Sequence, residues 1–131
     1  MIKDFTSAQV GKFGEDYCAK YLRWHGFRIY KRNAKIGHLE TDIIAYNRKL
    51  LVFVEVKTRR KDKHNYDTPA AAITYKKRTN LLNFAYAFIS NLPEKFKNKD
   101  IRLDVCEIWL TGDKKLKVCD LNYIEGAITG S

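Results

Sequence analysis

The sequence predicts one α/β domain, in which helices flank a mixed β-sheet in the order α-β-β-β-α-β-β. Two segments repeat apolar residues every three or four positions, as amphipathic helices do, and run over about 7–25 and 69–90. Continuous apolar runs and alternating apolar and polar residues elsewhere are typical of strands. The strands are expected over 27–30, 39–46, 50–57, 101–110 and 115–119.

Composition and charge narrow the class of protein. The 131 residues show no internal repeat or linker, so one domain is expected over 1–131, with its core at about 7–119 and the tail 120–131 unassigned. Basic residues outnumber acidic ones by 25 to 15, which gives a formal net charge of +10. This excess favours a polyanionic partner, with nucleic acid expected first and an anionic membrane surface second.

The cysteines and the apolar segments indicate a cellular location. Cys18, Cys106 and Cys119 show no CxxC spacing, which disfavours both a disulfide framework and a zinc site, so buried thiols are expected. The start of the sequence lacks a signal-peptide core, and no apolar segment approaches the length of a membrane span. We therefore expect a cytoplasmic protein without a membrane partner.

The first helix is predicted to begin at Thr6 or Ser7 and to end at Gly26, a residue suited to a C-terminal cap. Gly14 lies within its apolar stripe, where the missing side chain permits close approach to another element. Glu15 lies one position off the stripe, so spacing alone predicts a surface glutamate. Its functional alternative is a carboxylate that leans from the helix towards the strands.

A basic segment, 31–37, follows the short first strand and is predicted to be a loop. Lys31 and Arg32 in this segment are candidates for contacts with nucleic-acid phosphates, since such contacts supply most non-specific affinity. The alternative is a charged loop that is only solvated.

The strands 39–46 and 50–57 are predicted to form a hairpin, because the polar segment between them is short. The second strand begins with an unbroken apolar run, which is typical of a strand buried on both faces. Two registers remain open. A two-residue turn pairs Asn47 with Leu50, whereas a four-residue loop pairs Ala45 with Leu50.

Four charged side chains share one face of this hairpin in either register. Glu40 and Asp42 are two residues apart on one strand, and Glu55 and Lys57 are two apart on the other. Opposite Cβ atoms lie roughly 5 Å apart, and carboxylates that close repel unless a cation separates them. Because hard divalent cations prefer oxygen ligands, the pattern indicates a metal site with a lysine beside it. The alternative is a surface salt-bridge ladder, worth only about 0.2–1 kcal/mol per pair.

A strongly basic segment, 58–67, follows the hairpin and is predicted to be a loop at the rim of this site. Its residues Arg59, Arg60 and Lys61 suit contacts with a nucleic-acid backbone.

The second helix is predicted to start at Thr68-Pro69, or to restart at Thr74, and to run to about Ser90. Its apolar stripe, projected back one turn, passes through Lys77 and Arg78. Both residues are therefore predicted on the core-facing side near the helix N-terminus, where the dipole favours anions. We expect them to contact phosphate groups, with Lys77 beside the metal site.

Four segments together resemble the YraN-type family of small bacterial endonuclease-like proteins. Asp42 followed after twelve residues by Glu55-Val56-Lys57 resembles the PD-(D/E)XK nuclease signature. The wider resemblance extends over about 11–105 and rests on the segments 14–16, 40–45, 52–59 and 102–105. The core of that family is similar to archaeal Holliday junction resolvases.

The resemblance implies a restriction-endonuclease-like core and a Mg²⁺- or Mn²⁺-dependent nuclease that acts on DNA, with branched and single-stranded DNA as candidate substrates. By analogy with resolvases it also implies a homodimer. The alternative function is a nucleic-acid-binding protein of the same fold with little or no cleavage.

Residue roles follow from the resemblance. Asp42 and Glu55 would hold the metal together with the carbonyl of Val56. Lys57 would orient or activate water, and Glu15 would assist from the helix. Because Lys57 lies beside carboxylates, we expect it to stay charged and to act first by electrostatic stabilisation.

Overall fold

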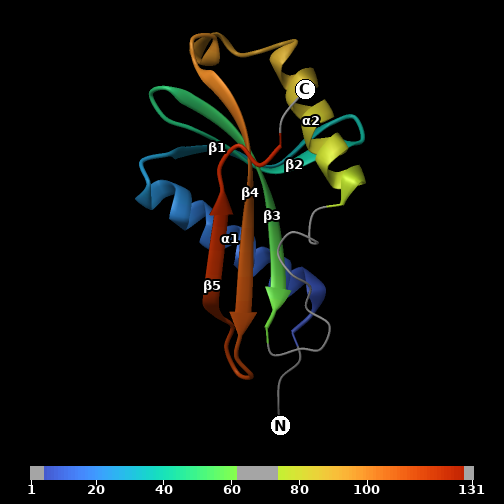
Figure 1. Cartoon of the computed structure of the whole chain (residues 1–131), viewed down its shortest axis with the longest axis vertical. Coiled ribbons are helices and arrows are strands. Elements are labelled where there is room, and N and C mark those ends of the chain that lie inside the picture. Colours follow the sequence, from blue (N-terminus) through green and yellow to red (C-terminus); the bar gives the residue numbers. More distant parts are fainter. Residues whose placement is uncertain (1–4, 62–73, 129–131) are drawn as a thin grey trace.

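The computed structural model describes residues 5–61 and 74–128, and the predicted order of helices and strands is confirmed. Five strands form one sheet in the order β1-β2-β3-β4-β5 (Figure 1). The elements are α1 (Ser7–Trp24), β1 (Arg28–Ile36), β2 (Leu39–Tyr46), β3 (Leu50–Arg60), α2 (Tyr75–Ile89), the short 3-10 helix η2 (Glu94–Phe96), β4 (Asp100–Thr111) and β5 (Lys117–Ile124).

The sheet is mixed, as predicted. β1, β2 and β3 are antiparallel neighbours, β3 and β4 run parallel, and β4 and β5 are antiparallel. A parallel pair needs a long crossover, which the segment containing α2 supplies. α1 packs mainly on β3 and α2 mainly on β2, and the two helices cover opposite faces of the sheet.

Each face of the sheet carries its own apolar core. Cys18 and Leu22 of α1 pack with Ile43 on one face, whereas Leu81 and Phe84 of α2 pack with the neighbouring residue Ile44 on the other. Successive residues of β2 and β3 thus alternate between two cores. This is why the apolar run that begins β3 is unbroken, as expected for a strand buried on both faces.

The ends of α1 agree with the prediction. Thr6 caps the N-terminus in a capping box with Gln9, and Gly26 follows the helix with a positive φ of 87°. Gly14 lies against β3, where a Cβ would come within 2.9 Å of the Cβ of Thr58. The close approach predicted for this glycine is therefore confirmed.

The predicted loop at 31–37 is wrong, because β1 continues from Arg28 to Ile36. Arg32 pairs with Ile43 of β2, so Lys31 and Arg32 lie in a strand. The turn falls at Gly37, where φ is 61°. Pairing with an apolar partner strand decides the conformation here, although the segment itself is basic and polar.

Two further strands are longer than predicted. β3 extends to Arg60, which pairs with Leu110 of β4, so Arg59 and Arg60 lie in a strand and not in a loop. β5 runs from Lys117 to Ile124 and includes part of the tail left unassigned. Polar edge and end positions lack the apolar alternation that marks a buried strand, and their ladder partners supply the structure instead.

α2 begins after Thr74, whose side chain accepts a hydrogen bond from the Lys77 N–H, as one of the two predicted starts requires. The other start, at Thr68-Pro69, lies outside the described residues. Lys77 and Arg78 are both exposed, because the buried stripe begins only at Leu81. Lys77 nevertheless faces the sheet, since its Nζ lies 3.5 Å from Glu55 Oε1, so the position predicted for it is confirmed. None of the helices described is long and apolar enough to cross a membrane.

The expectation of three buried thiols is correct for two of the cysteines. Cys18 and Cys106 are buried in the core beneath α1. Cys119 is exposed because it lies on the edge strand β5, where its thiol donates to the carbonyl of Trp109.

Candidate active site

The sheet opens into a fork where the predicted metal site lies. β2 and β3 pair from Tyr46 and Leu51 at the turn as far as Ile43 and Val54. Beyond that point β2 stays with β1 while β3 stays with β4. The Asn47 N–H donates to the carbonyl of Leu50 at 3.0 Å, so the two-residue-turn register is confirmed and the four-residue loop is wrong.

Asp42 and Glu55 lie at the mouth of this fork, one on each limb. In the observed register Ile43 faces Val54, which brings Asp42 opposite Glu55. Ile44 and Phe53, one step nearer the turn on the same face, both pack under α2. The two carboxylates therefore share the α2 face.

Asp42 connects the two limbs. Its Oδ2 accepts a hydrogen bond of 2.7 Å from the backbone N–H of Val56. Burial raises the pKa of Asp42, the Val56 N–H opposes this shift, and the negative charge of Glu15 adds to it. The carboxylate is therefore held in place within a site that resists negative charge.

The pKa of Glu55 is strongly raised. Burial and then the charge of Asp42 raise the pKa of Glu55 from 4.5 to about 7. The ammonium of Lys77 acts in the opposite direction, with its Nζ 3.5 Å from Glu55 Oε1. α2 thus brings Lys77 to the site, although its side chain is 46% exposed.

Glu15 extends from α1, and two residues of β1 hold its carboxylate by hydrogen bonds. Its Oε1 accepts hydrogen bonds of 3.0 Å from both Arg32 Nε and Asn33 Nδ2. Arg32 also donates to Asp16 at 2.6 Å, so its guanidinium is engaged by two carboxylates. Only 12% of the Glu15 side chain is exposed, so the surface glutamate that spacing predicts is wrong.

Asn33 was missed by the sequence analysis. It has φ of 51° in the middle of β1, and its amide contacts Glu15. A single asparagine in a basic segment carries no signal by itself. Only the pairing of β1 with β2 shows that this position lies beside the fork.

Two other predicted residues lie further out. Glu40 is exposed and pairs with Lys35 in the β1–β2 limb, so it departs from Glu55 as the fork widens. Lys57 is half-buried on β3, and alternation puts it on the same face as Glu55. Its neighbour on β4 is Glu107, a second buried carboxylate that sequence reasoning missed.

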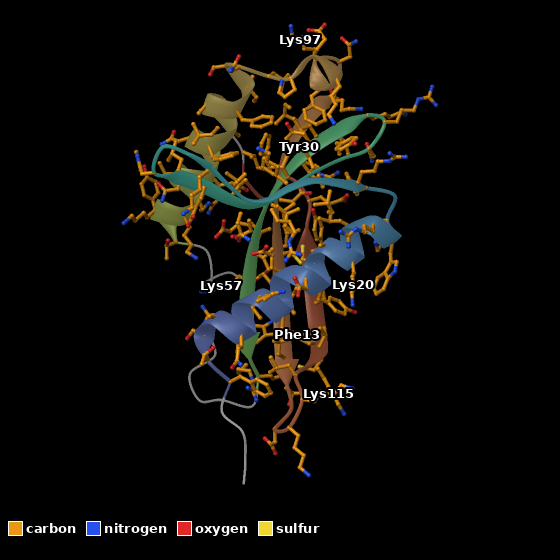
Figure 2. The ribbon with its side chains drawn as sticks, turned by 180° about the vertical axis from the view of Figure 1, so that it is seen from behind. Phe13, Lys20, Tyr30, Lys57, Lys97 and Lys115 are labelled. Atoms are coloured by element: carbon orange, nitrogen blue, oxygen red, sulfur yellow. The ribbon has the colours of Figure 1, made fainter. Side chains whose placement is uncertain are left out.

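The basic residues predicted to bind nucleic acid are spread over the molecule. Lys31, Lys61 and Arg78 are exposed, and Arg59 is half-buried at the end of β3. Arg60 donates from Nη2 to the carbonyl of Gly112 at 2.7 Å. Figure 2 shows Lys57 midway along the molecule, well away from both Lys97 and Lys115 at its two ends.

The donor set suits a hard divalent cation. Among the residues described, no group of three or more His, Cys, Asp or Glu side chains is arranged to hold a metal ion. Asp42 and Glu55 are a pair of carboxylates, and the carbonyl of Val56 would be the third oxygen donor that the resemblance implies. Mg²⁺ is often held by one or two carboxylates and completes its shell with water and substrate phosphates. The raised pKa of Glu55 also shows that a positive charge would relieve the repulsion.

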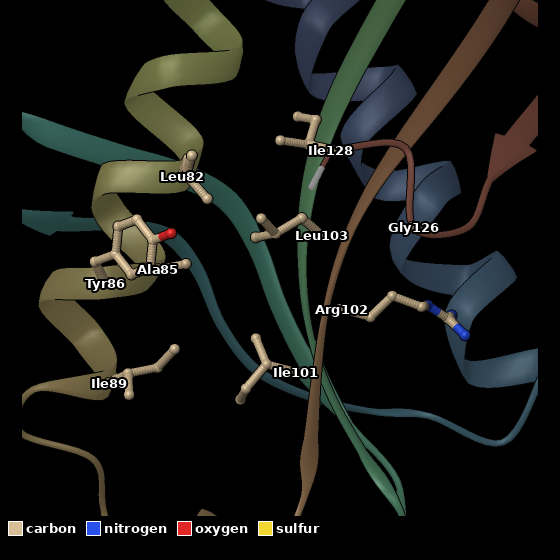
Figure 3. A pocket seen from close by; sticks show the side chains of 9 residues that line it. All are labelled: Leu82, Ala85, Tyr86, Ile89, Ile101, Arg102, Leu103, Gly126 and Ile128. Atoms are coloured by element: carbon tan, nitrogen blue, oxygen red, sulfur yellow. The ribbon is translucent and has the colours of Figure 1, made fainter. Parts of the chain in front are cut away.

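A hollow separate from the fork lies between α2 and the start of β4, and it is mainly apolar. It measures about 370 Å³ and is lined mainly by apolar side chains, among them Leu82, Ile89, Ile101 and Leu103 (Figure 3). No carboxylate lines it. The carboxylates predicted from the sequence therefore lie at the fork and not in this groove.

Comparison with known proteins finds relatives over most of the chain. A family model described as "Uncharacterised protein family UPF0102" matches residues 14–108. A UPF0102 protein of Dictyoglomus thermophilum is 40% identical over 122 residues, which are 93% of this chain and 98% of the relative. A UPF0102 protein of Caldicellulosiruptor saccharolyticus is 38% identical over 119 residues, 91% of this chain and 96% of the relative.

Among solved structures, the chain is similar to SfsA of Pyrococcus furiosus, determined in complex with Ca²⁺. The TM-score is 0.44 and the sequence identity 16%. The similarity covers 94% of this chain and 65% of the SfsA chain, so this chain spans less than two thirds of that longer protein.

Proposed function

The chain belongs to the UPF0102 family, the YraN-type family that the sequence indicates, and we propose that it is a metal-dependent nuclease that hydrolyses phosphodiester bonds of DNA. The observation that carries the proposal is the pair Asp42 and Glu55 at the mouth of the fork. Burial raises the pKa of both carboxylates, and the negative charges of Glu15 at Asp42 and of Asp42 at Glu55 add to the rise. Two such groups on one face are stabilised by a cation between them.

Each residue of the site has a task in this proposal. Asp42 and Glu55, with the carbonyl of Val56, would hold Mg²⁺ or Mn²⁺. The metal, when bound, neutralises charge on the phosphate and makes water a better nucleophile. Lys57 would stabilise the charge that develops on the phosphate and orient the attacking water. Glu15 would assist from α1, and exposed Glu40 would add negative charge at the lip of the site.

DNA is the proposed partner because the net charge of +10 favours a polyanion. The exposed cations Lys31, Lys61, Lys77 and Arg78 would contact phosphates, together with Arg59 and Arg60 at the end of β3. Arg32 is already bound by Glu15 and Asp16, so its contribution would be smaller. Branched and single-stranded DNA remain the candidate substrates, and a homodimer the proposed assembly.

A second candidate is DNA binding with little or no cleavage. One observation favours it: the Lys77 ammonium already lies 3.5 Å from Glu55 and offsets part of its charge without a metal. This ion pair would stabilise the acidic residues of the fork in a protein that binds DNA but holds no metal.

The test combines metal binding with cleavage. Isothermal calorimetry with Mg²⁺ and Mn²⁺, and cleavage of four-way-junction, single-stranded and linear DNA, would compare wild type with Asp42→Asn and Glu55→Gln. Both variants keep the side-chain shape but lose the charge, so metal binding should fall and cleavage should drop by about 10²-fold or more.

Glu94→Gln is the matched control, since that side chain is 86% exposed and forms an ion pair with Lys97. It should cleave as wild type does. Wild-type DNA binding without metal uptake, and without any loss in Asp42→Asn, would contradict the nuclease and support the second candidate.

A further inference from the structure

We propose that Asn33 is a positioning residue of the active site, which holds Glu15 in the fork beside Asp42. The inference rests on the proposed function, because it gives a further residue of that site a task. Asn33 lies outside the motif formed by Asp42, Glu55 and Lys57.

The backbone of Asn33 is the first observation. Its φ of 51° lies in the left-handed region, and no other non-glycine residue among 5–61 and 74–128 has a positive φ. This conformation is disfavoured for residues with a Cβ and is usual in turns, yet Asn33 lies within β1. Such residues persist where their surroundings fix them and are frequent at functional sites. Asparagine tolerates the conformation better than most side chains.

The position of Asn33 in the sheet is the second observation. Arg32 pairs with Ile43 and Ala34 pairs with Thr41, so Asn33 falls opposite Asp42. The left-handed backbone interrupts the alternation of side chains along β1. The amide Nδ2 donates to Glu15 Oε1 at 3.0 Å, so β1 joins α1 at the level of Asp42.

The two donors on Glu15 act on the same oxygen. Arg32 Nε and Asn33 Nδ2 both bind Oε1 at 3.0 Å, which fixes the orientation of the carboxylate and leaves Oε2 outside this pair of contacts. Arg32 also binds Asp16. Asn33 donates without adding a charge, so it orients Glu15 while leaving its negative charge available to the site.

Glu15 is close enough to the fork for its charge to matter. The two residues that bind Glu15, Arg32 and Asn33, lie in β1 beside Ile43 and Asp42 of β2, where the fork opens. An open hollow of about 560 Å³, lined by Lys12, Glu15, Arg32 and Asn33, leads from solvent to this carboxylate. Water or a substrate group can therefore reach the carboxylate that Asn33 holds.

The substitution Asn33→Gly tests the side-chain amide separately from the backbone conformation. Glycine adopts φ of 51° without strain, so this variant removes the amide and keeps the strand. Asn98→Gly, at an exposed turn position, is the matched control. We expect Asn33→Gly to melt within a few degrees of wild type, with kcat for DNA cleavage lowered about tenfold and KM unchanged.

A double-mutant cycle with Glu15→Gln distinguishes positioning from a structural role. If Asn33 acts through Glu15, then Asn33→Gly should change kcat little in the Glu15→Gln background. The side-chain amide signals of Asn33 in an ¹⁵N NMR spectrum should also shift on Glu15→Gln, a readout that needs neither metal nor cleavage.

The outcomes separate the inference from the proposed function. If the wild type cleaves DNA and Asn33→Gly has the same kcat, the role of Asn33 is overturned while the proposed function stands. Additive losses of kcat in the double-mutant cycle would have the same meaning. If wild type neither takes up Mg²⁺ or Mn²⁺ nor cleaves any of the DNA substrates, the proposed function fails and the inference fails with it.

Discussion

The pKa of Glu55 is raised because this residue is buried beside another acid. The raised pKa, about 7 against an ordinary 4.5, comes first from burial and then from Asp42. The folded protein therefore binds a proton that the unfolded chain releases at lower pH. This contribution to stability is fully present below pH 4.5 and is lost as the pH rises through about 7.

A pH series of unfolding measurements tests this residue. In chelator-treated protein, the free energy of unfolding of wild type minus that of Glu55→Gln should fall by about 2–3 kcal/mol between roughly pH 5 and pH 8. Glutamine cannot ionise, so the variant subtracts the titration of all other groups. A difference that stays flat over this range would show that Glu55 is not protonated in the fold.

Asp104, in a segment that carries the family resemblance, serves stability and not the site. It is fully buried, and Arg102 binds it through Nε at 2.9 Å and Nη2 at 3.0 Å. The Tyr123 hydroxyl and the Gly126 N–H complete its partners at 2.6 and 2.9 Å. This one carboxylate therefore ties β4 to β5 and to the chain beyond it.

Removal of that carboxylate should be costly. Asp104→Ala leaves Arg102 and the Tyr123 hydroxyl without their common acceptor, so we expect about 3–5 kcal/mol of lost stability in urea unfolding. Asp113→Ala, at an exposed turn, is the control and should change little. If Asp104→Ala lowers the free energy of unfolding by less than about 1 kcal/mol, Asp104 contributes no more than a surface ion pair does.

At the scale of elements, the packing of α1 against β3 depends on one glycine. A Cβ on Gly14 would overlap the side chain of Thr58, whereas a Cβ on Gly11, one turn earlier, would meet nothing within 4 Å. The two glycines therefore have opposite consequences within one helix. Gly14 also precedes Glu15, so the contact sets how far that carboxylate reaches towards the fork.

Two alanine substitutions test how closely α1 packs against β3. Gly14→Ala should lower stability by about 1–3 kcal/mol, because the helix must move away from β3. Gly11→Ala should raise stability by up to about 1 kcal/mol, since alanine favours the helix. Thermal and urea unfolding report both changes. Equal stabilisation by the two substitutions would mean that α1 does not approach β3 this closely.

The fork is also a property of elements. β2 pairs with β3 only from Ile43 to Tyr46, because its first half, before Ile43, pairs with β1 alone while β3 continues beside β4. The Asp42 carboxylate then takes the place of a ladder acceptor by binding the Val56 N–H. The acidic side chains of the proposed site thus lie where backbone pairing stops.

For the whole molecule, the net charge of +10 makes salt the natural probe of binding. If DNA crosses the fork, its affinity should fall linearly with salt concentration on logarithmic axes, by about 0.9 for each phosphate contact. Lys77→Ala should reduce this slope by about one contact. Lys115→Ala should not, because Lys115 lies at the end of the molecule away from Lys57 (Figure 2).

Fluorescence anisotropy with labelled duplex at several salt concentrations gives these slopes. An affinity that salt does not change would exclude phosphate contacts as its source. Equal effects of Lys77→Ala and Lys115→Ala would indicate diffuse attraction to the molecule and not a path across the fork.

The sequence alone determined the order of helices and strands and the shared face of Asp42 and Glu55. Both follow from local rules, since strand side chains alternate with a period of two and helices repeat every three to four residues. The short polar segment also limited the hairpin to two registers. Neither conclusion required knowledge of distant contacts.

Only the tertiary structure decided where the sheet divides and how Glu15 is held. The extension of β1, the left-handed Asn33 and the ion pair of Arg32 with Glu15, seventeen residues earlier, all depend on how α1 and β2 dock against β1. A basic, polar segment has no periodicity that reports such docking. Its conformation is set by partners distant in sequence, so local patterns predicted a loop where pairing produced half of the site.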